Sequence, residues 1–117
     1  MPGIRMAGPR TLFNVAANTN VLLYDQIAGR SAIVRKISWR NMQAGQRVLR
    51  IGTGVAGAAA ITDLVPNILC PANLNGDIAE VDLPGLATQA NQDIVGQVDG
   101  ISANDFECQV EVEIIGA

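Results

Sequence analysis

The stretch that decides the fold is Phe106-Glu107-Cys108-Gln109-Val110-Glu111-Val112-Glu113-Ile114, in which apolar and polar residues alternate without a break. Successive side chains of a β-strand point to opposite faces, so the apolar residues share one face and the polar residues share the other. A helical period would scatter the same residues around the whole circumference. The stretch therefore predicts a long strand with one face on a core and an acidic face toward water or a partner.

The remaining sequence predicts further short strands separated by turns. Hydrophobic residues make up 49% of the 117 residues but aromatic residues only 3%, and 12 Gly and 5 Pro supply turn positions. Seven more strands are expected, at residues 11–17, 21–27, 32–41, 46–52, 67–70, 78–83 and 93–98. Residues 32–52 read as a hairpin, and residues 53–65 read as either two helical turns or a flexible loop around a short strand. Closely spaced strands without a long helix predict an all-β protein, an antiparallel β-sandwich of about eight short strands that is jelly-roll-like.

The first ten residues, Met-Pro-Gly-Ile-Arg-Met-Ala-Gly-Pro-Arg, contain two Pro and two Gly and too few apolar residues to form a face. This composition predicts an extended N-terminal arm over residues 1–10, followed by one β-sandwich domain over residues 11–117. Such arms are either disordered or lie across a neighbouring molecule. In the second case Ile4 and Met6 are the residues that would anchor it.

Charge is distributed unevenly along the chain. All eight basic residues lie within the first fifty positions, where Asp25 is the only acid, and the other acids all follow. Two arrangements fit: ion pairs between neighbouring strands of one domain, or basic and acidic faces that meet between copies. Arg35 falls on an apolar strand face, which predicts either a bulge between Val34 and Ile37 or a place at the rim. The candidate assembly contacts are Ile4, Arg5, Met6, Arg10, Arg35, Arg40, Arg47, Arg50, Glu107, Glu111 and Glu113.

Few residues suit catalysis or a cofactor. The chain has no His, which removes the commonest general base and metal ligand. Cys70 and Cys108 read best as small buried hydrophobic residues, although a disulfide between them is the alternative. Gly52-Thr53-Gly54-Val55-Ala56-Gly57 matches a dinucleotide-binding pattern, but Pro66 leaves too little room for its helix, and the surroundings offer no parallel sheet. We therefore expect no catalytic residues, no metal site and no cofactor.

Membranes and nucleic acids are not expected partners. No apolar run approaches the ~18 residues that span a bilayer, and the first residues lack the apolar region of a signal peptide. The sequence pI of about 4.7 and the scarcity of aromatic residues argue against nucleic-acid binding. These features predict a protein that is made in a cytoplasm and is not exported.

The chain resembles the small all-β accessory proteins of tailed-phage virions, of the capsid decoration or cement type. The likeness lies in the arm Met1–Arg10, in the stretch 11–24, in the strands 34–41 and 47–52, and in the final alternating strand. It implies a non-catalytic structural protein that forms a homo-oligomer and decorates or reinforces a bacteriophage capsid. Its partners would be its own copies and the major capsid protein or another virion protein, and it would be located in the virion. The alternative is a carbohydrate- or ligand-binding β-sandwich module, which requires an exposed Trp39 or Tyr24, whereas the assembly role predicts a buried Trp39.

Overall fold

The computed structural model describes residues 4–25, 28–88, 91–100 and 105–115. Within these residues it contains nine strands and one short 3₁₀ helix, η1 (Glu80–Asp82). The strands are β1 (Ile4–Ala7), β2 (Thr11–Leu12), β3 (Val21–Tyr24), β4 (Ser31–Asn41), β5 (Arg47–Gly54), β6 (Ile61–Cys70), β7 (Leu74–Ile78), β8 (Ile94–Val98) and β9 (Phe106–Ile115).

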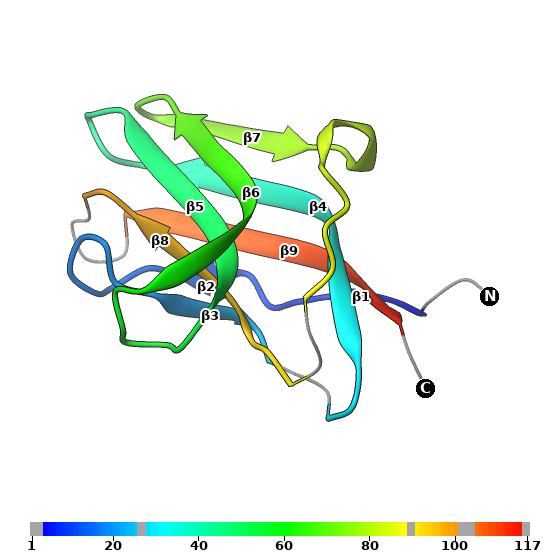
Figure 1. Ribbon diagram of the computed structural model, residues 1–117. Coiled ribbons are helices and arrows are strands. Elements are labelled where there is room, and N and C mark those ends of the chain that lie inside the picture. The colour runs from blue at the N-terminus through cyan, green and yellow to red at the C-terminus, as the bar shows by residue number, and fades with distance from the viewer. Residues whose placement is uncertain (1–3, 26–27, 89–90, 101–104, 116–117) are drawn as a thin grey trace.

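The strands form two antiparallel sheets that pack face to face (Figure 1). The sheet that we call sheet A has the order β1-β9-β4-β7, with β2 also pairing β9, and sheet B has the order β3-β8-β5-β6. The pairings are nested: β9 pairs β1 and β2, β8 pairs β3, β7 pairs β4, and β6 pairs β5. This nesting is what results when one long hairpin is rolled into two sheets, which is a jelly roll. The predicted fold class is confirmed.

The final strand has the character that its sequence predicts. Burial alternates along the whole of β9, and Phe106, Cys108, Val110 and Val112 are completely buried between the sheets. Phe106 packs edge-to-face against Phe13, with ring centroids 5.4 Å apart. Because β9 lies between β4 and the β1–β2 pair, its backbone is hydrogen-bonded on both sides, and it forms the centre of sheet A.

Arg35 lies in a β-bulge. The pairing of β4 with β9 shifts register between Val34 and Lys36, so that Arg35 has no directly opposite partner. The extra residue lets Val34 and Ile37 both remain buried while Arg35 turns toward Glu113. The first of the two predicted explanations, a bulge, is therefore confirmed.

The predicted hairpin over residues 32–52 is wrong. Strands β4 and β5 belong to different sheets, and the loop between them crosses from sheet A to sheet B. Buried Asn41 stabilises the crossing, since its Nδ2 donates hydrogen bonds to the carbonyl oxygens of Gly45 and Cys70 at 3.0 and 2.9 Å. Alternation along each strand predicts its faces, but it does not identify its hydrogen-bonding neighbour.

The predicted strand at 78–83 is also wrong, as is the turn that the pair Asn75-Gly76 favours by its composition. The strand comes first, as β7, and residues 80–82 form η1. Gly76 lies in the strand because the Trp39 ring covers it, and a Cβ there would stand 2.5 Å from Trp39 Cζ2. A glycine within a strand often marks such a close approach rather than a turn.

Residues 53–65 contain no helix, and the strand predicted at 67–70 begins earlier than expected. Thr53 and Gly54 end β5, residues 55–60 form a connecting loop, and β6 runs from Ile61 to Cys70. The β5–β6 pairing shifts register between Leu49 and Ile51, opposite the backbone of Pro66. Proline has no N–H to donate, and β6 is an edge strand with an irregularity at this point, which is where a strand tolerates proline.

Candidate functional site

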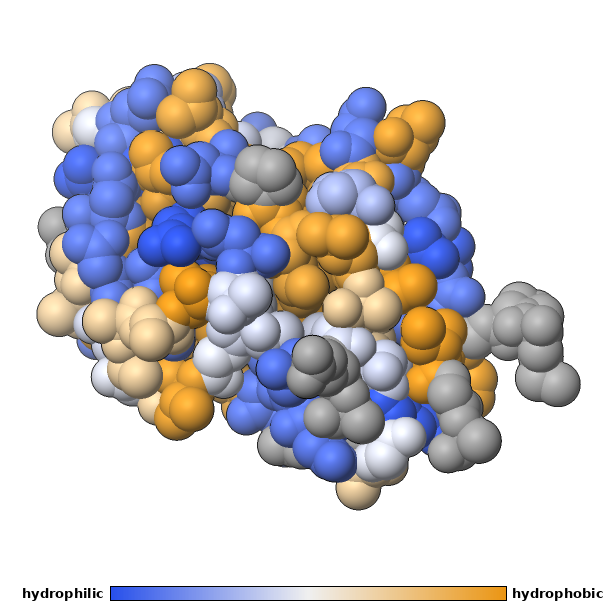
Figure 2. Space-filling view, viewed as in Figure 1, coloured by the Kyte–Doolittle hydropathy of each residue, from blue (hydrophilic) through white to orange (hydrophobic). Residues whose placement is uncertain are grey.

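The apolar inner face of sheet A extends beyond sheet B at strand β1. Ile4 lies opposite Ile114 and Met6 lies opposite Val112, and directly opposite residues share a face of the sheet. Ile114 and Val112 are buried, yet Ile4 is 59% exposed and Met6 is 45% exposed. Figure 1 shows β1 and the end of β9 projecting past the strands of sheet B, and Figure 2 shows apolar surface beside the termini at this end. The four residues of β1 that the arm prediction included are thus an extended strand whose core-side surface is uncovered.

The opposite edge of sheet A, strand β7, shows the same property less strongly. Leu74 lies opposite buried Asn41, so its side chain is also on the inner face, but it is 53% exposed. Next along this face, Gly76 is covered by Trp39, and Ile78 packs partly against the core. Both edges of sheet A therefore carry inner-face apolar side chains that sheet B leaves open.

The outer face of sheet A carries a network of ion pairs. Arg5 Nη2 lies 2.8 Å from Glu80 Oε1, and Arg35 Nε lies 2.9 Å from Glu113 Oε1 and 3.4 Å from Glu80 Oε1. Arg5 also lies within 4.0 Å of Glu111 and Glu113. The hydrogen bond to Glu80 raises the pKa of Arg5 further above its usual value, so its guanidinium stays charged. These residues join β1, β4, β9 and η1 across one face.

A second group of charges lies farther along the same face. Arg10 Nε donates to Glu107 Oε2 at 2.9 Å, and Arg40 Nη1 lies 3.9 Å from the other carboxylate oxygen of Glu107. On sheet B, Arg50 makes two 3.0 Å hydrogen bonds to the carboxylate of Asp63. Arg47 donates instead to Gln43 Oε1. The chain thus contains the ion pairs between neighbouring strands that the uneven charge distribution allowed.

These contacts place the residues that the sequence singled out. Arg5, Arg35, Glu111 and Glu113 come together in one network, and Arg10, Arg40 and Glu107 form the other. Ile4 and Met6 lie on the opposite face of β1 from Arg5, and Arg47 and Arg50 lie on sheet B, apart from both networks. Glu80, Leu74 and Asp77 are not among the predicted assembly contacts, because the strand boundaries predicted for their region are wrong.

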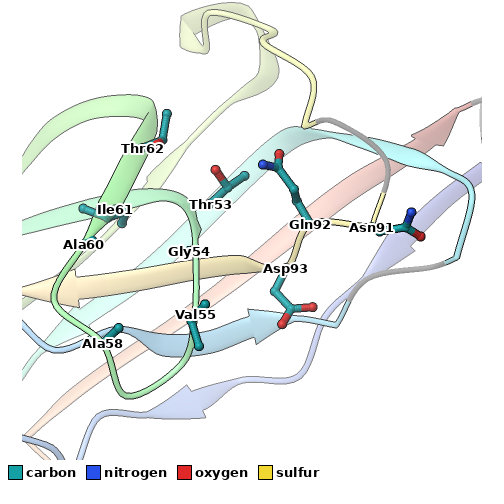
Figure 3. Close-up of a pocket in the computed structure, with 10 residues that line it drawn as sticks. All are labelled: Thr53, Gly54, Val55, Ala58, Ala60, Ile61, Thr62, Asn91, Gln92 and Asp93. Carbon is teal, nitrogen blue, oxygen red and sulfur yellow. The ribbon is translucent and has the colours of Figure 1, made fainter.

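An open cup lies at one end of the sandwich, between the β5–β6 loop and residues 91–93 (Figure 3). Its volume is about 450 Å³, and its polar lining comes from Thr53, Thr62, Asn91, Gln92 and Asp93. Val55, Ala58, Ala60 and Ile61 supply its apolar wall. None of the described residues that line it is aromatic, so none of them offers a ring on which a sugar could stack.

Two buried amides hold the β5–β6 loop in place. Asn20 Nδ2 donates to the carbonyl oxygens of Val55 and Ala60 at 3.1 and 2.7 Å. Gln97 Nε2 donates to Asn20 Oδ1 at 2.7 Å and to the carbonyl oxygen of Ala59 at 3.0 Å. Because both amides are almost wholly buried, their hydrogen bonds have no competition from water. The loop is therefore a fixed wall of the cup, with Val55 71% exposed at its tip.

The two cysteines are free and buried. Burial raises the pKa of the Cys70 thiol to about 12 and also raises the pKa of Cys108. The thiolate is the reactive form of cysteine, so neither side chain is prepared to act as a nucleophile near neutral pH. In the described ranges, no group of three or more Cys, Asp and Glu side chains is arranged to hold a metal ion.

Comparison with known proteins adds little. No protein-family model matches the chain, and no curated protein matches it. Among solved structures, the tobacco streak virus coat protein is similar with a TM-score of 0.41 and 11% sequence identity, over 99% of this chain and 89% of that one. A TM-score this low does not establish a common fold, and it says nothing about what this chain does.

Among the residues that the structure describes, no helix has the length and apolar character that crossing a bilayer requires.

Proposed function

We propose that this protein is a non-catalytic structural protein that self-associates and, as an oligomer, decorates or reinforces a viral capsid. The observation that carries the proposal is the uncovered inner face of sheet A at β1, where Ile4 and Met6 remain exposed on the core side of the sheet. Apolar side chains on a core-facing surface gain free energy when another surface removes them from water. We call this exposed inner face of β1, with Ile4 and Met6, the β1 overhang. A partner that covers it would shield it from water as sheet B shields the inner face of β9.

The rest of the molecule fits a structural role. Trp39 is 7% exposed, as the assembly role requires, and Tyr24 is only half-buried. Jelly rolls occur both in viral capsids and in lectins, so the fold is compatible with both functions. The residues on the surface are what distinguish one function from the other. Exposed apolar side chains also occur away from β1, at Leu69, Leu74, Val81 and Leu86, which suits a protein with several neighbours.

Light scattering on the purified protein tests self-association, at low and high salt. We expect a defined oligomer that persists at high salt, because burial of apolar surface is not screened by ions, whereas exposed ion pairs are. A monomer at both salt concentrations and at high protein concentration would contradict the proposal. An oligomer that dissociates in high salt would indicate that the contact between copies lies on the charged outer face of sheet A and not at the β1 overhang.

Sedimentation with assembled shells tests the capsid role. The shells are built from the major capsid protein encoded by the same genome, and the protein is added in excess. We expect it to pellet with the shells at a fixed ratio, and the double variant Ile4→Ser/Met6→Ser to pellet less. Saturable binding is the required result, because nonspecific adhesion does not reach a fixed ratio.

A ligand-binding module is the second candidate, and the cup beside the β5–β6 loop favours it. Hydroxyl, amide and carboxylate groups line a fixed wall, which suits a small polar ligand. NMR titration with a panel of oligosaccharides tests this function. Shifts confined to Thr53, Thr62 and residues 91–93 would support it, and the absence of any shift at millimolar concentration would remove it.

A further inference from the structure

We propose that copies of this chain associate by antiparallel pairing of β1 of one copy with β7 of the next, so that sheet A continues from molecule to molecule. The inference rests on the proposed self-association and specifies its interface. It follows from the direction, the charge and the apolar residues of the two free edges of sheet A.

Strand direction allows this pairing without turning either molecule over. Every neighbouring pair in the order β1-β9-β4-β7 is antiparallel, so β1 and β7 run in opposite directions. A second copy placed beside the first with its sheet A facing the same way therefore presents β7 antiparallel to β1. The inner faces of both copies then lie on the same side.

Among the strands at the ends of the two sheet orders, β1 and β7 are the two suited to accept a new strand. In sheet B, β3 has a register shift between Leu22 and Tyr24, and β6 has register shifts and contains Pro66, devices that block edge pairing. In contrast, the register of β1 with β9 and of β7 with β4 is continuous. Both strands therefore present a regular row of backbone groups to a neighbour.

The charges on the outer faces of these edges are complementary. β1 carries Arg5 on its outer face, where it pairs with Glu80 of its own chain, and β7 carries Asp77 on the same face. Pairing of Arg5 with Asp77 of the next copy places opposite charges directly across the ladder. Pairing of β1 with a second β1 about a two-fold axis would instead place Arg5 opposite Arg5 when Ile4 faces Met6. Pairing of two β7 strands would bring the Asp77 side chains of the two copies close together.

The same register matches the apolar residues. With Arg5 opposite Asp77, Ile4 lies opposite Ile78 of the next copy, and Met6 lies opposite Gly76, between Leu74 and Ile78. The exposed inner-face side chains of both edges then cover one another, as side chains do inside the sheet. Because the two edges are different surfaces, this interface is heterologous and produces a ring or an open filament.

Cross-strand disulfides test the pairing while leaving Arg5 and Asp77 in place. Ala7 and Asn75 are directly opposite in the proposed register, on the outer face, and both are exposed. Directly opposite Cα atoms of antiparallel strands lie about 4.5–5.5 Å apart, which is within the Cα separation that a disulfide spans. The buried Cys70 and Cys108 do not interfere, since both are inaccessible. The variants are Ala7→Cys, Asn75→Cys and, as a matched control, Asn67→Cys, which is exposed on β6.

The single variants are mixed in pairs, one partner carrying a mass tag, and oxidised with oxidised glutathione. We expect Ala7→Cys to cross-link with Asn75→Cys several-fold more than either cross-links with itself, and the double variant to form a ladder of covalent oligomers. Predominant self-linking of Ala7→Cys, or linking no greater than that of Asn67→Cys, would overturn the interface. Light scattering on the wild-type protein separates the two proposals: an oligomer without the mixed cross-link contradicts only this interface, whereas a monomer contradicts self-association itself.

Discussion

Strands β9 and β1 lie side by side in sheet A and share an alternation of apolar and polar residues, but their environments differ. The apolar side chains of β9 from Phe106 to Ile114 are at most 5% exposed, whereas Ile4 and Met6 on β1 are about half exposed. The difference arises because sheet B covers β9 and ends before it reaches β1. The same alternation therefore places apolar side chains in the core on β9 and on an exposed surface on β1. The position of each strand in the sheet accounts for the difference.

Removal of a large side chain from each strand is the strongest test of this difference. We expect Phe106→Ala to lower the free energy of unfolding by ~3–5 kcal/mol, because it leaves a cavity against Phe13. Met6→Ala should change it by no more than about 0.5 kcal/mol in the monomer. Urea unfolding at low protein concentration measures both values. A large loss from Met6→Ala would show that the monomer already covers this residue.

Alkaline pH tests the burial of the core side of β9 through Cys108, together with Cys70. Both thiols have a raised pKa in the folded protein, so the unfolded chain loses these protons first as the pH rises above about 9. The unfolded state then binds fewer protons, and stability falls between pH 9 and about 12 by at most ~1.4 kcal/mol per pH unit for each thiol. Urea midpoints between pH 7 and 10.5 measure the slope. Cys70→Ala should flatten it, and an unchanged slope in this variant would contradict the assignment.

Gly76→Ala extends the comparison to the other edge of sheet A. Trp39 covers this position, so the added methyl group forces the buried ring to move and should cost about 1–3 kcal/mol. Ala7→Ser on β1 is the control, since that side chain is exposed and should tolerate the change. Thermal unfolding with tryptophan fluorescence reports both stability and the Trp39 environment. An unperturbed Gly76→Ala protein would mean that β7 is as open as β1.

The smallest effect is expected on the outer face of sheet A. Arg10→Ala removes the ion pair to Glu107, which is partly exposed, so the loss should be within about 1 kcal/mol and smaller in high salt. Arg10→Lys is the matched control because it retains the charge. A loss as large as that from Phe106→Ala would mean that this face is buried in a contact between copies.

Sequence reasoning located features that depend on a single strand. Alternation predicts β9, and the position of Arg35 on an apolar face predicts either a bulge or a place at the rim, because charged side chains are excluded from an apolar core. It failed where the outcome depends on tertiary partners. Asn75-Gly76 forms a good turn in isolation, but in this fold Gly76 is the residue that fits beneath Trp39. Likewise, no local pattern shows that β4 and β5 pair in different sheets.

The residues of the candidate surfaces divide in the same way, into those that a single strand predicts and those that depend on tertiary partners. Ile4 and Met6 were selected from the sequence, and the structure shows why they differ from core residues. Asn20 and Gln97 were not selected, because a polar residue in a strand or turn is ordinarily solvated. Only the folded chain brings Asn20 from one end of a turn against the carbonyl groups of residues 55–60. Buried amide networks of this kind leave no signal in periodicity.

The central place of β9 has a consequence for how the chain folds. A ribosome completes β1, β2, β4 and β7 before it makes the strand that joins three of them, so sheet A stays open until β9 has been made. The register joins Ile4 to Ile114, which are 110 positions apart in the sequence, and folds with such distant pairings form slowly, in about milliseconds to seconds. Throughout that delay, nascent chains on the same messenger expose unpaired strand edges to one another. Translation rate and temperature should therefore affect the yield of correctly folded protein.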